Sequence, residues 1–557
     1  MKTRVIHLIL AILTLSFAST CAAMDEADLR LQSMSLEQKV GQLFTVFFTG
    51  EALGPELQGF IANRHIGGLI LYDSVGNVRS AAQVAKLVAD AQRFALSCRQ
   101  PGLFVSVDQE GGPVARLRRG FAVPPANMAV GASGDPSLAG LAASITAAQL
   151  KAVGVNMNFA PSVDVNSNPA NPIIGVRSYG GQPQDVGRFG AEAIQAYLSA
   201  GIIPVAKHFP GHGDTGFDSH LKLPTVPHSR ARLEALELPP FRAAIRAGVP
   251  AIMTAHVEVP SLEPAPGLPA TMSRRILTDL LRQELDFDGL IVTDSMSMGA
   301  ITEHFGPAEA CLNAFKAGAD ILLFGADKGH APKDFIPAWK RLLNAAYSGE
   351  VSSQRLNASV LRILKAKSRF GILAPSWPDP ERAEGLTGTP DQQTATRLIA
   401  ASGLTLLRNE QNLLPLDTES AILVLWPDAK APFLREADRP EGLQFMALPR
   451  DPGPGHVALA LQAARRFDSV VVLTSRALQR KGQGLLLNAL CDAGLAERTV
   501  MVSIDTPYDI LAAPCIGSWL AAYSDVPASV ASLTDALFGR LAAKGQLPVE
   551  LPLVKTE

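Results

Sequence analysis

Short apolar runs alternate with helical stretches over residues 36–370, and this pattern constrains the fold more than any other feature of the sequence. Eight of the runs are strand-like, and each is followed by a segment long enough to form a helix. They span residues 42–48, 68–71, 103–107, 155–160, 203–207, 251–255, 289–293 and 320–324. Eight βα units over roughly 330 residues predict a (β/α)8 barrel of the TIM type with some enlarged loops.

An open, doubly wound parallel sheet is the alternative architecture for such a pattern. Sheets of that kind usually carry a glycine-rich phosphate-binding turn after the first strand. Here the first strand-like run is followed by Thr49-Gly50-Glu51, which has no such spacing of glycines. The barrel is therefore the preferred prediction.

The C-terminal third of the chain predicts a second, smaller domain. Residues 371–395 are rich in Pro and Gly, as is typical of a linker. Beyond them, helical stretches such as 456–466 and 529–541 separate four strand-like runs at 421–426, 469–474, 499–504 and 519–522. This order predicts a three-layer α/β/α sandwich. The predicted organisation is a signal peptide at 1–23, a catalytic barrel at 24–370, a linker at 371–395 and the sandwich at 396–557.

The N-terminus has the features of an export signal. Lys2 and Arg4 precede an apolar run at residues 5–17, which is too short to span a bilayer, and Ala23 suits cleavage before Met24. We expect an exported protein, periplasmic or extracellular. A lipid anchor on Cys21 is less favoured because Thr20 precedes it where lipid-modified proteins normally have Ala, Gly or Ser. No later segment reaches ~18 apolar residues without a charge, so the mature chain predicts no transmembrane helix.

Charge and cysteine content narrow the functional classes further. Lys plus Arg number 50 against 52 Asp plus Glu, without a basic run, so a nucleic-acid partner is not expected. The four cysteines beyond the leader form no CxxC pair, which disfavours a thiolate zinc site or a redox motif. Cys491 and Cys515 are near enough in sequence to pair, and the sequence does not decide between a disulfide and buried free thiols.

Polar residues stand where several of the predicted barrel strands end. Asp108, His208, His256 and Asp294 each follow such a run, and Lys207 closes one of them. A single residue of this kind is often a helix cap, as Asp294 before Ser295 could be. The functional residues of a βα barrel lie at the carboxyl ends of its strands. Because four predicted strands each end in such a polar residue, the pattern indicates a functional site at that end of the barrel.

Residues 207–220 concentrate ionisable groups among Gly and Pro, and two kinds of chemistry fit them. His208, His212, Asp214, Asp218 and His220 are all potential metal ligands, although they lack an established ligand spacing. Acid–base chemistry is the other interpretation. Asp218 and His220 are two residues apart, so in an extended segment their side chains point the same way. A carboxylate bonded to one imidazole nitrogen fixes the tautomer and makes the other nitrogen a better base.

Four sequence motifs resemble glycoside hydrolase family 3, and within it the β-N-acetylglucosaminidase branch. They are KHFPGHGDTGFDSH (207–220), VDQEGGPVARL (107–117), NPIIGVRSYG (171–180) and GLIVTDSMSMGAI (289–301). The C-terminal part, including GLTLLRNEQNLLPL (403–416) and GQLPVELP (545–552), is similar to the second domain of the family. The resemblance covers nearly the whole mature chain.

The resemblance implies a role for each matching residue. Asp294 matches the nucleophile, His220 matches the general acid/base of this branch, and Asp218 matches its dyad partner. The residues that match those holding the non-reducing sugar are Asp108, Arg177, Lys207 and His208. Asp164 and His256 lie in segments that also resemble the pocket-forming segments of the family. The family needs neither a metal nor another cofactor.

The implied activity is that of a retaining exo-β-N-acetylglucosaminidase, acting through a covalent glycosyl-enzyme. Its substrates would be GlcNAc-containing oligosaccharides or muropeptides from cell walls, during peptidoglycan turnover, or oligosaccharides from chitin. Phosphate as an acceptor in place of water is a weaker hypothesis. We expect a monomer. The alternatives are a β-glucosidase or β-xylosidase of the same family and a non-catalytic sugar-binding protein.

Overall fold

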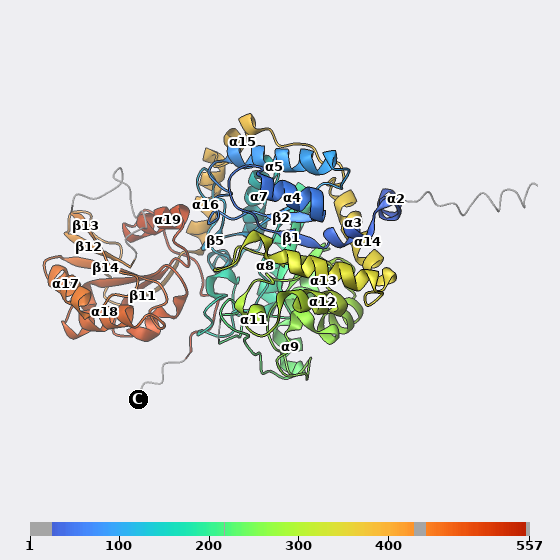
Figure 1. Cartoon of the computed structure of the whole chain (residues 1–557). Coiled ribbons are helices and arrows are strands. Elements are labelled where there is room, and N and C mark those ends of the chain that lie inside the picture. Colours follow the sequence, from blue (N-terminus) through green and yellow to red (C-terminus); the bar gives the residue numbers. More distant parts are fainter. Residues whose placement is uncertain (1–24, 217, 428–441, 553–557) are drawn as a thin grey trace, which may run out of the picture.

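The computed structural model describes residues 25–216, 218–427 and 442–552, so the predicted signal peptide and Cys21 lie outside the described residues. Two bodies, each built around its own sheet, lie side by side (Figure 1). The larger one holds the N-terminal part of the chain, and the smaller one, coloured orange to red, holds the C-terminal part.

The larger body is an eight-stranded parallel barrel, as the sequence predicts. Its sheet has the order β10-β1-β2-β3-β6-β7-β8-β9. A parallel bridge between Val292 and Ile321 joins the two ends of this order and closes the ring. Each of the eight predicted runs coincides with one strand, although β7 extends two residues beyond the predicted end at Lys207. The strands are β1 (Phe44–Val46), β2 (Gly68–Ile70), β3 (Phe104–Val107), β6 (Met157–Asn158), β7 (Ile203–Phe209), β8 (Ala251–Thr254), β9 (Leu290–Val292) and β10 (Leu322–Phe324).

Amphipathic helices cover the outside of the barrel. In α8 (Pro183–Ala200), Val186, Phe189, Ala193 and Tyr197 are buried at helical spacing, and Gly201 ends the helix with φ 78°. The other helices of this body are α2 (Glu26–Ser33), α3 (Leu36–Gly41), α4 (Pro55–Arg64), α5 (Ala81–Ser97), α6 (Asn127–Ala132), α7 (Ser137–Ala152), α9 (Arg230–Leu236), α10 (Leu238–Arg246), α11 (Gly299–Thr302), α12 (Pro307–Ala317), α13 (Ile336–Tyr347) and α14 (Ser353–Arg369), together with the π-helix η3 (Arg275–Glu284).

Helix α14 joins the last part of the barrel to its beginning through a buried lysine. The Nζ of Lys367 donates to Gln42 Oε1 at 2.7 Å and to the carbonyl of Gly67 at 2.9 Å. Both partners lie immediately before barrel strands, at the end of the barrel opposite the strand ends that carry the polar residues. Because burial disfavours the charged form, the pKa of Lys367 is well below its usual value.

The smaller body is a three-layer sandwich, which confirms the predicted fold class. Its sheet has the order β11-β16-β15-β14-β12-β13, and only β11 runs antiparallel to its neighbour. Alternate residues of each strand face opposite layers: Val471 packs with α19 (Pro527–Leu537), and Val472 packs with α17 (Pro454–Ala464) and α18 (Lys481–Asp492). The strands β12 (Ile422–Trp426), β14 (Ser469–Thr474), β15 (Thr499–Ser503) and β16 (Ser518–Ala521) fall on the four predicted runs. The edge strands β11 (Thr405–Asn409) and β13 (Leu443–Ala447) were not predicted.

Contacts between the two bodies are both apolar and polar. Met128 and Val176 of the barrel side pack in one cluster with Tyr508 and Tyr523 of the sandwich. The amide of Asn166 also donates to the Tyr508 hydroxyl at 2.9 Å. The segment 371–395 contains α15 (Pro380–Leu386), which packs on α5, and the first residues of α16 (Pro390–Gly403), which contacts both α6 and α19. The sandwich is thus held against the barrel along an extended interface.

Cys491 and Cys515 form a disulfide inside the sandwich, which resolves the alternative that the sequence left open. Cys98 and Cys311 are free thiols. Among residues 25–216, 218–427 and 442–552, no helix is both long enough and apolar enough to cross a membrane.

Candidate active site

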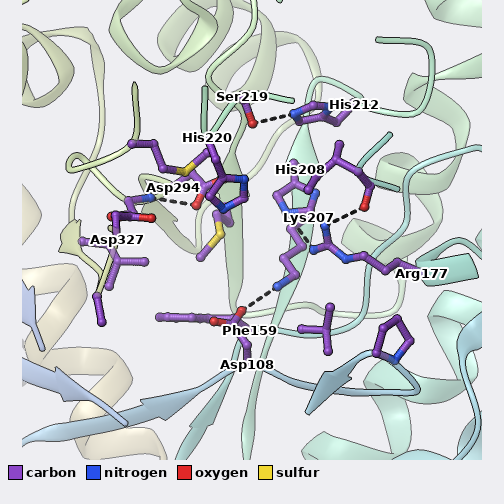
Figure 2. A pocket seen from close by; sticks show the side chains of 18 of the residues that line it. Asp108, Phe159, Arg177, Lys207, His208, His212, Ser219, His220, Asp294 and Asp327 are labelled. Atoms are coloured by element: carbon purple, nitrogen blue, oxygen red, sulfur yellow. Dashed lines mark hydrogen bonds and ion pairs between the residues drawn. The ribbon is translucent and has the colours of Figure 1, made fainter. Parts of the chain in front are cut away.

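A pocket of about 480 Å³ opens at the carboxyl ends of the barrel strands. Six of the seven residues that the sequence nominates line it: Asp108, Arg177, Lys207, His208, His220 and Asp294. Figure 2 shows how these side chains, which come from different segments of the chain, lie around one space. Asp218 does not line the pocket and instead bonds to His220. The sequence-predicted site is therefore one continuous arrangement in space.

One side of the pocket is a buried network of two cations and two carboxylates. Lys207 Nζ lies 2.8 Å from Asp108 Oδ1 and 2.7 Å from Glu110 Oε1. Arg177 makes two bonds to Glu110, from Nη2 at 2.8 Å and from Nε at 3.0 Å. Burial opposes ionisation of Glu110, yet Arg177 and Lys207 hold its pKa at about 2. Rigid, ionised groups of this kind can donate to and accept from several hydroxyls of one sugar.

Asp164 orients the next residue of this network without lining the pocket. Its Oδ2 lies 2.6 Å from His208 Nδ1, and its Oδ1 accepts the backbone amide of His212 at 2.8 Å. A proton on Nδ1 then leaves His208 Nε2 as the nitrogen that faces Arg177, 3.4 Å from Nη2. His256 is likewise behind the pocket, with Nε2 2.9 Å from the carbonyl of Ser295. Asp164 and His256 therefore hold in place two residues that line the pocket, His208 and Ser295.

Asp294 follows β9 and presents an ionised carboxylate to the pocket. The backbone amide of Ser295 donates to its Oδ1 at 2.7 Å. Burial would raise its pKa, but the nearby histidines His208, His256 and His220 and the Ser295 amide lower it to about 2. The lowered pKa favours the ionised form of Asp294 at neutral pH, which is the form that a nucleophile needs.

His220 reaches the same pocket from the loop after β7, and its surroundings favour the protonated form of the imidazole. Its Nδ1 lies 2.7 Å from Asp218 Oδ1. This bond raises the pKa of His220, against the effect of burial, and the charge of Asp294 adds to the rise. Half of the side chain is exposed. An imidazolium on an accessible loop beside a carboxylate is an arrangement suited to proton donation.

The five residues that the sequence offered as metal ligands are divided among separate contacts. His208 bonds to Asp164, while His212 lies 2.9 Å from both Thr215 Oγ1 and Ser219 Oγ. Asp214 bonds to His228 at 2.6 Å. Within the described part of the chain, no three His, Cys, Asp or Glu residues are grouped so that they could share a metal ion. The geometry favours the acid–base interpretation.

Several pocket residues were not predicted from the sequence. Asp327 follows β10, and its Oδ2 accepts a bond from Ser295 Oγ at 2.5 Å. Burial raises its pKa. The rule that nominates polar residues after barrel strands applies to Asp327 as well, so the sequence held a signal for it. Tyr72, Arg116, Lys328 and Arg476 also line the pocket. Arg476 belongs to the sandwich, so no pattern within the barrel could have nominated it.

Comparisons with known proteins agree with this geometry. Residues 35–366 match the family model described as the glycosyl hydrolase family 3 N terminal domain. A beta-hexosaminidase A of Pseudoalteromonas piscicida is 34% identical, over 89% of this chain and 91% of that protein. A beta-N-acetylglucosaminidase/beta-glucosidase of Cellulomonas fimi is 28% identical over 93% and 94% of the two chains. The solved structure of a glycoside hydrolase family 3 beta-N-acetylglucosaminidase from Paenibacillus sp. str. FPU-7 superposes with a TM-score of 0.85, with 38% identity and coverage of 94% of this chain and all of that one.

Proposed function

The chain belongs to glycosyl hydrolase family 3, and on this premise we propose that it is a retaining exo-β-N-acetylglucosaminidase, which releases terminal β-linked GlcNAc. The observation that carries the proposal is the pairing of Asp294 with His220 in one pocket: an ionised carboxylate stands beside an imidazole whose pKa is raised by Asp218. The two relatives that cover most of the chain, and the solved structure, carry names for activity on N-acetylhexosaminides.

The proposed reaction has two steps that share one covalent intermediate. In the first step, an oxygen of Asp294 forms a bond to the anomeric carbon as the bond to the leaving oxygen breaks. His220 gives its Nε2 proton to that oxygen. In the second step, neutral His220 takes a proton from water while the water oxygen displaces Asp294. The enzyme returns to its starting state, and the sugar keeps its β configuration.

Asp218 would act through His220. Because the carboxylate bonds to Nδ1, the proton that moves is on Nε2, and the nearby negative charge stabilises the imidazolium. The more usual arrangement uses two carboxyl groups. In this proposal the aspartate Asp294 is the nucleophile, and the histidine His220 replaces the second carboxyl group as the general acid/base.

Recognition of the terminal sugar is assigned to Asp108, Arg177, Lys207 and His208. The network that holds them is almost fully buried, with side-chain exposures of 2% for Lys207 and 1% for Glu110. A buried wall of this kind at one side of the pocket supports the proposal of exo-action from the non-reducing end.

Export is also part of the proposal. The N-terminal leader favours it, and the Cys491–Cys515 disulfide is typical of proteins that mature in an oxidising compartment. In that setting, fragments of cell walls or of chitin are the natural sources of terminal GlcNAc. We propose that the enzyme acts on them as a monomer.

A panel of 4-nitrophenyl β-glycosides tests the proposal. We expect fast release from the GlcNAc derivative and little release from the glucoside and the xyloside. Comparable rates on the glucoside would favour the dual specificity named for the Cellulomonas fimi relative. Absence of release from every glycoside, with a folded protein, would favour a sugar-binding protein. NMR of the first product, before mutarotation, shows whether the β configuration is kept.

A further inference from the structure

The tip of the loop that carries His220 lies against the segment that follows Asp294. The backbone amide of Gly299 donates to the carbonyl of His220, and the amide of Ala300 donates to the carbonyl of Ser219, each at 3.2 Å. Gly299 comes five residues after Asp294 and is the first residue of α11. The acid/base and the nucleophile of the proposed reaction are therefore connected through main-chain hydrogen bonds, in addition to sharing a pocket.

This contact requires a residue without a side chain at position 299. A Cβ at Gly299 would stand 2.7 Å from the carbonyl oxygen of His220 and 2.8 Å from that of Leu221. These distances are shorter than van der Waals contact, and main-chain atoms cannot turn aside as the end of a flexible side chain can. The φ of Gly299 lies outside the left-handed region. The glycine is thus needed for space and not for its backbone conformation.

On the nucleophile side of the contact, the chain is fixed by a buried turn. The amide of Met298 donates to the carbonyl of Ser295 at 3.1 Å, and the amide of Ser295 donates to Asp294 at 2.7 Å. Met298 and Ser295 are both buried. The loop tip is more open, since Leu221 is 69% exposed. An added methyl group on Gly299 would therefore displace the loop tip more readily than the turn.

On its other side, the loop tip is braced by a buried histidine. His212 Nε2 lies 2.9 Å from Ser219 Oγ, and Figure 2 shows the two side chains turned toward each other. His212 Nδ1 lies 2.9 Å from Thr215 Oγ1, and the backbone amide of His212 donates to Asp164 at 2.8 Å. Ser219 is thus held through its hydroxyl by His212 and through its carbonyl by α11. His220 directly follows this doubly held residue.

We propose that Gly299 is a positioning residue for the acid/base. The loop tip is clamped between His212 and α11, and this clamp holds the imidazole of His220 at the distance from the leaving oxygen that proton donation requires. The inference rests on the proposed function and extends it, because it names the contact that sets the spacing of the two catalytic side chains. A misplacement of about 1 Å in a catalytic group can cost ~10²-fold in rate.

Two aryl β-GlcNAc glycosides separate a misplaced acid from a general loss of activity. The 4-methoxyphenyl glycoside has a poor leaving group and needs proton donation, whereas the 2,4-dinitrophenyl glycoside does not. We expect Gly299→Ala to lower kcat/KM for the first about 10- to 100-fold and for the second about twofold at most. A purely structural role for the glycine would lower both values alike.

Gly306→Ala is the matched control. Gly306 lies beyond α11 with a φ of -66°, and an added Cβ there would meet no described atom within 4 Å. Its kcat/KM for both glycosides should equal that of the wild type. A loss confined to the poor leaving group in this variant as well would show that the effect is not specific to the contact with His220, and would overturn the inference.

Ser219→Ala decides the question if thermal melting shows that Gly299→Ala does not fold. It removes the hydroxyl that bonds to His212 without adding bulk, and it should give the same dependence on the leaving group in milder form. Equal losses on both glycosides, or none, in the folded variant overturn the inference. His220→Ala is the reference. If it shows the dependence and the folded variant does not, only the positioning role is wrong; if the wild type cleaves neither glycoside, the proposed function itself fails.

Discussion

The imidazole of His220 and the carboxylate of Asp218 meet within one loop, with Nδ1 and Oδ1 2.7 Å apart, and the backbone amide of His220 donates to the same oxygen at 2.9 Å. One carboxylate oxygen therefore fixes both the position and the tautomer of the ring. Nε2 remains as the nitrogen available for chemistry in the pocket.

Replacing His220 with Ala should slow the cleavage of natural disaccharides far more than the first step on activated aryl glycosides. A sugar alkoxide needs a proton to leave, whereas nitrophenolate leaves with little help, and general acid–base assistance is typically worth ~10²–10⁴-fold. The second step also loses its base, so the glycosyl-enzyme should accumulate. Azide, which needs no base, should restore turnover and give the β-glycosyl azide. An equal loss on both substrate types, without rescue by azide, would mean that another residue is the acid/base.

Asp218→Asn should move the alkaline limb of the pH profile to lower pH. The first step needs protonated His220, so kcat/KM falls as pH rises through the pKa of this residue. The bond to Asp218 is the largest cause that raises this pKa above its usual 6.5, and an amide removes the charge and weakens the bond. The measurement is kcat/KM against pH on a substrate with a poor leaving group. An unchanged limb would show that Asp218 does not tune the imidazole.

Asp294→Ala should abolish turnover and leave the fold intact. The intermediate forms on this carboxylate, and its removal eliminates both steps. A 5-fluoro or 2-deoxy-2-fluoro glycosyl trap should label Asp294 in the parent enzyme. Asp327 is the informative comparison: it also lines the pocket, and unlike Asp108 it forms no ion pair with a described residue, although it accepts a bond from Ser295. Peptide mapping that finds the label on Asp327 would transfer the role to that residue.

Arg177→Ala and Lys207→Ala should each lower kcat/KM at least about tenfold, because each removes charge-assisted bonds to the sugar worth ~1.5–3 kcal/mol. The same changes leave Glu110 short of a buried partner, so thermal stability should fall as well. Arg188→Ala is the control: this arginine is exposed on α8, and its one ion pair among the described residues is with Asp185 of the same helix. Wild-type kinetics in both pocket variants would place the sugar elsewhere.

Glu237→Gln should stabilise the protein at neutral pH. Glu237 is buried against Gly211, and neither of its carboxyl oxygens has a partner among the described residues. Burial, and then the charge of Asp164, raises its pKa from 4.5 to about 8. Between these two pH values, the native state keeps a proton that the unfolded chain releases, so the free energy of unfolding falls as pH rises. The variant removes this cost, which is roughly 1–3 kcal/mol at pH 7.

The pH dependence of that gain distinguishes it from a general effect of the substitution. The difference in Tm between Glu237→Gln and wild type should be largest above pH 8 and should vanish near pH 4. Glu234→Gln, on the exposed face of the preceding helix α9, should change Tm little at any pH. A gain that is independent of pH would show that Glu237 is ionised in the native protein.

The barrel and most of the pocket could be predicted because their signals are local. Each barrel strand is a short apolar run, and Asp108, Lys207, His208 and Asp294 stand at the ends of such runs. The edge strands β11 and β13 were not predicted because most of their residues are only partly buried or exposed, so they form no continuous apolar run like that of β12. Arg476 could not be predicted as a pocket residue for a different reason. Its place in the pocket depends on how two bodies pack, which no periodicity within the chain encodes.

The bonds from Lys367 to Gln42 and Gly67 show that the barrel depends on residues beyond the stretch that matches the family model. Similarity to the family model ends at residue 366, one position before this lysine. A gene fusion that moved residues 35–366 alone would leave the Gln42 side chain and the Gly67 carbonyl facing a void under the first strands. Ile372 and Leu373, buried in the same core, would be lost as well. The unit that keeps this core intact is therefore longer than the matched stretch, and an isolated barrel should include α14 to its last turn and the residues up to Leu373.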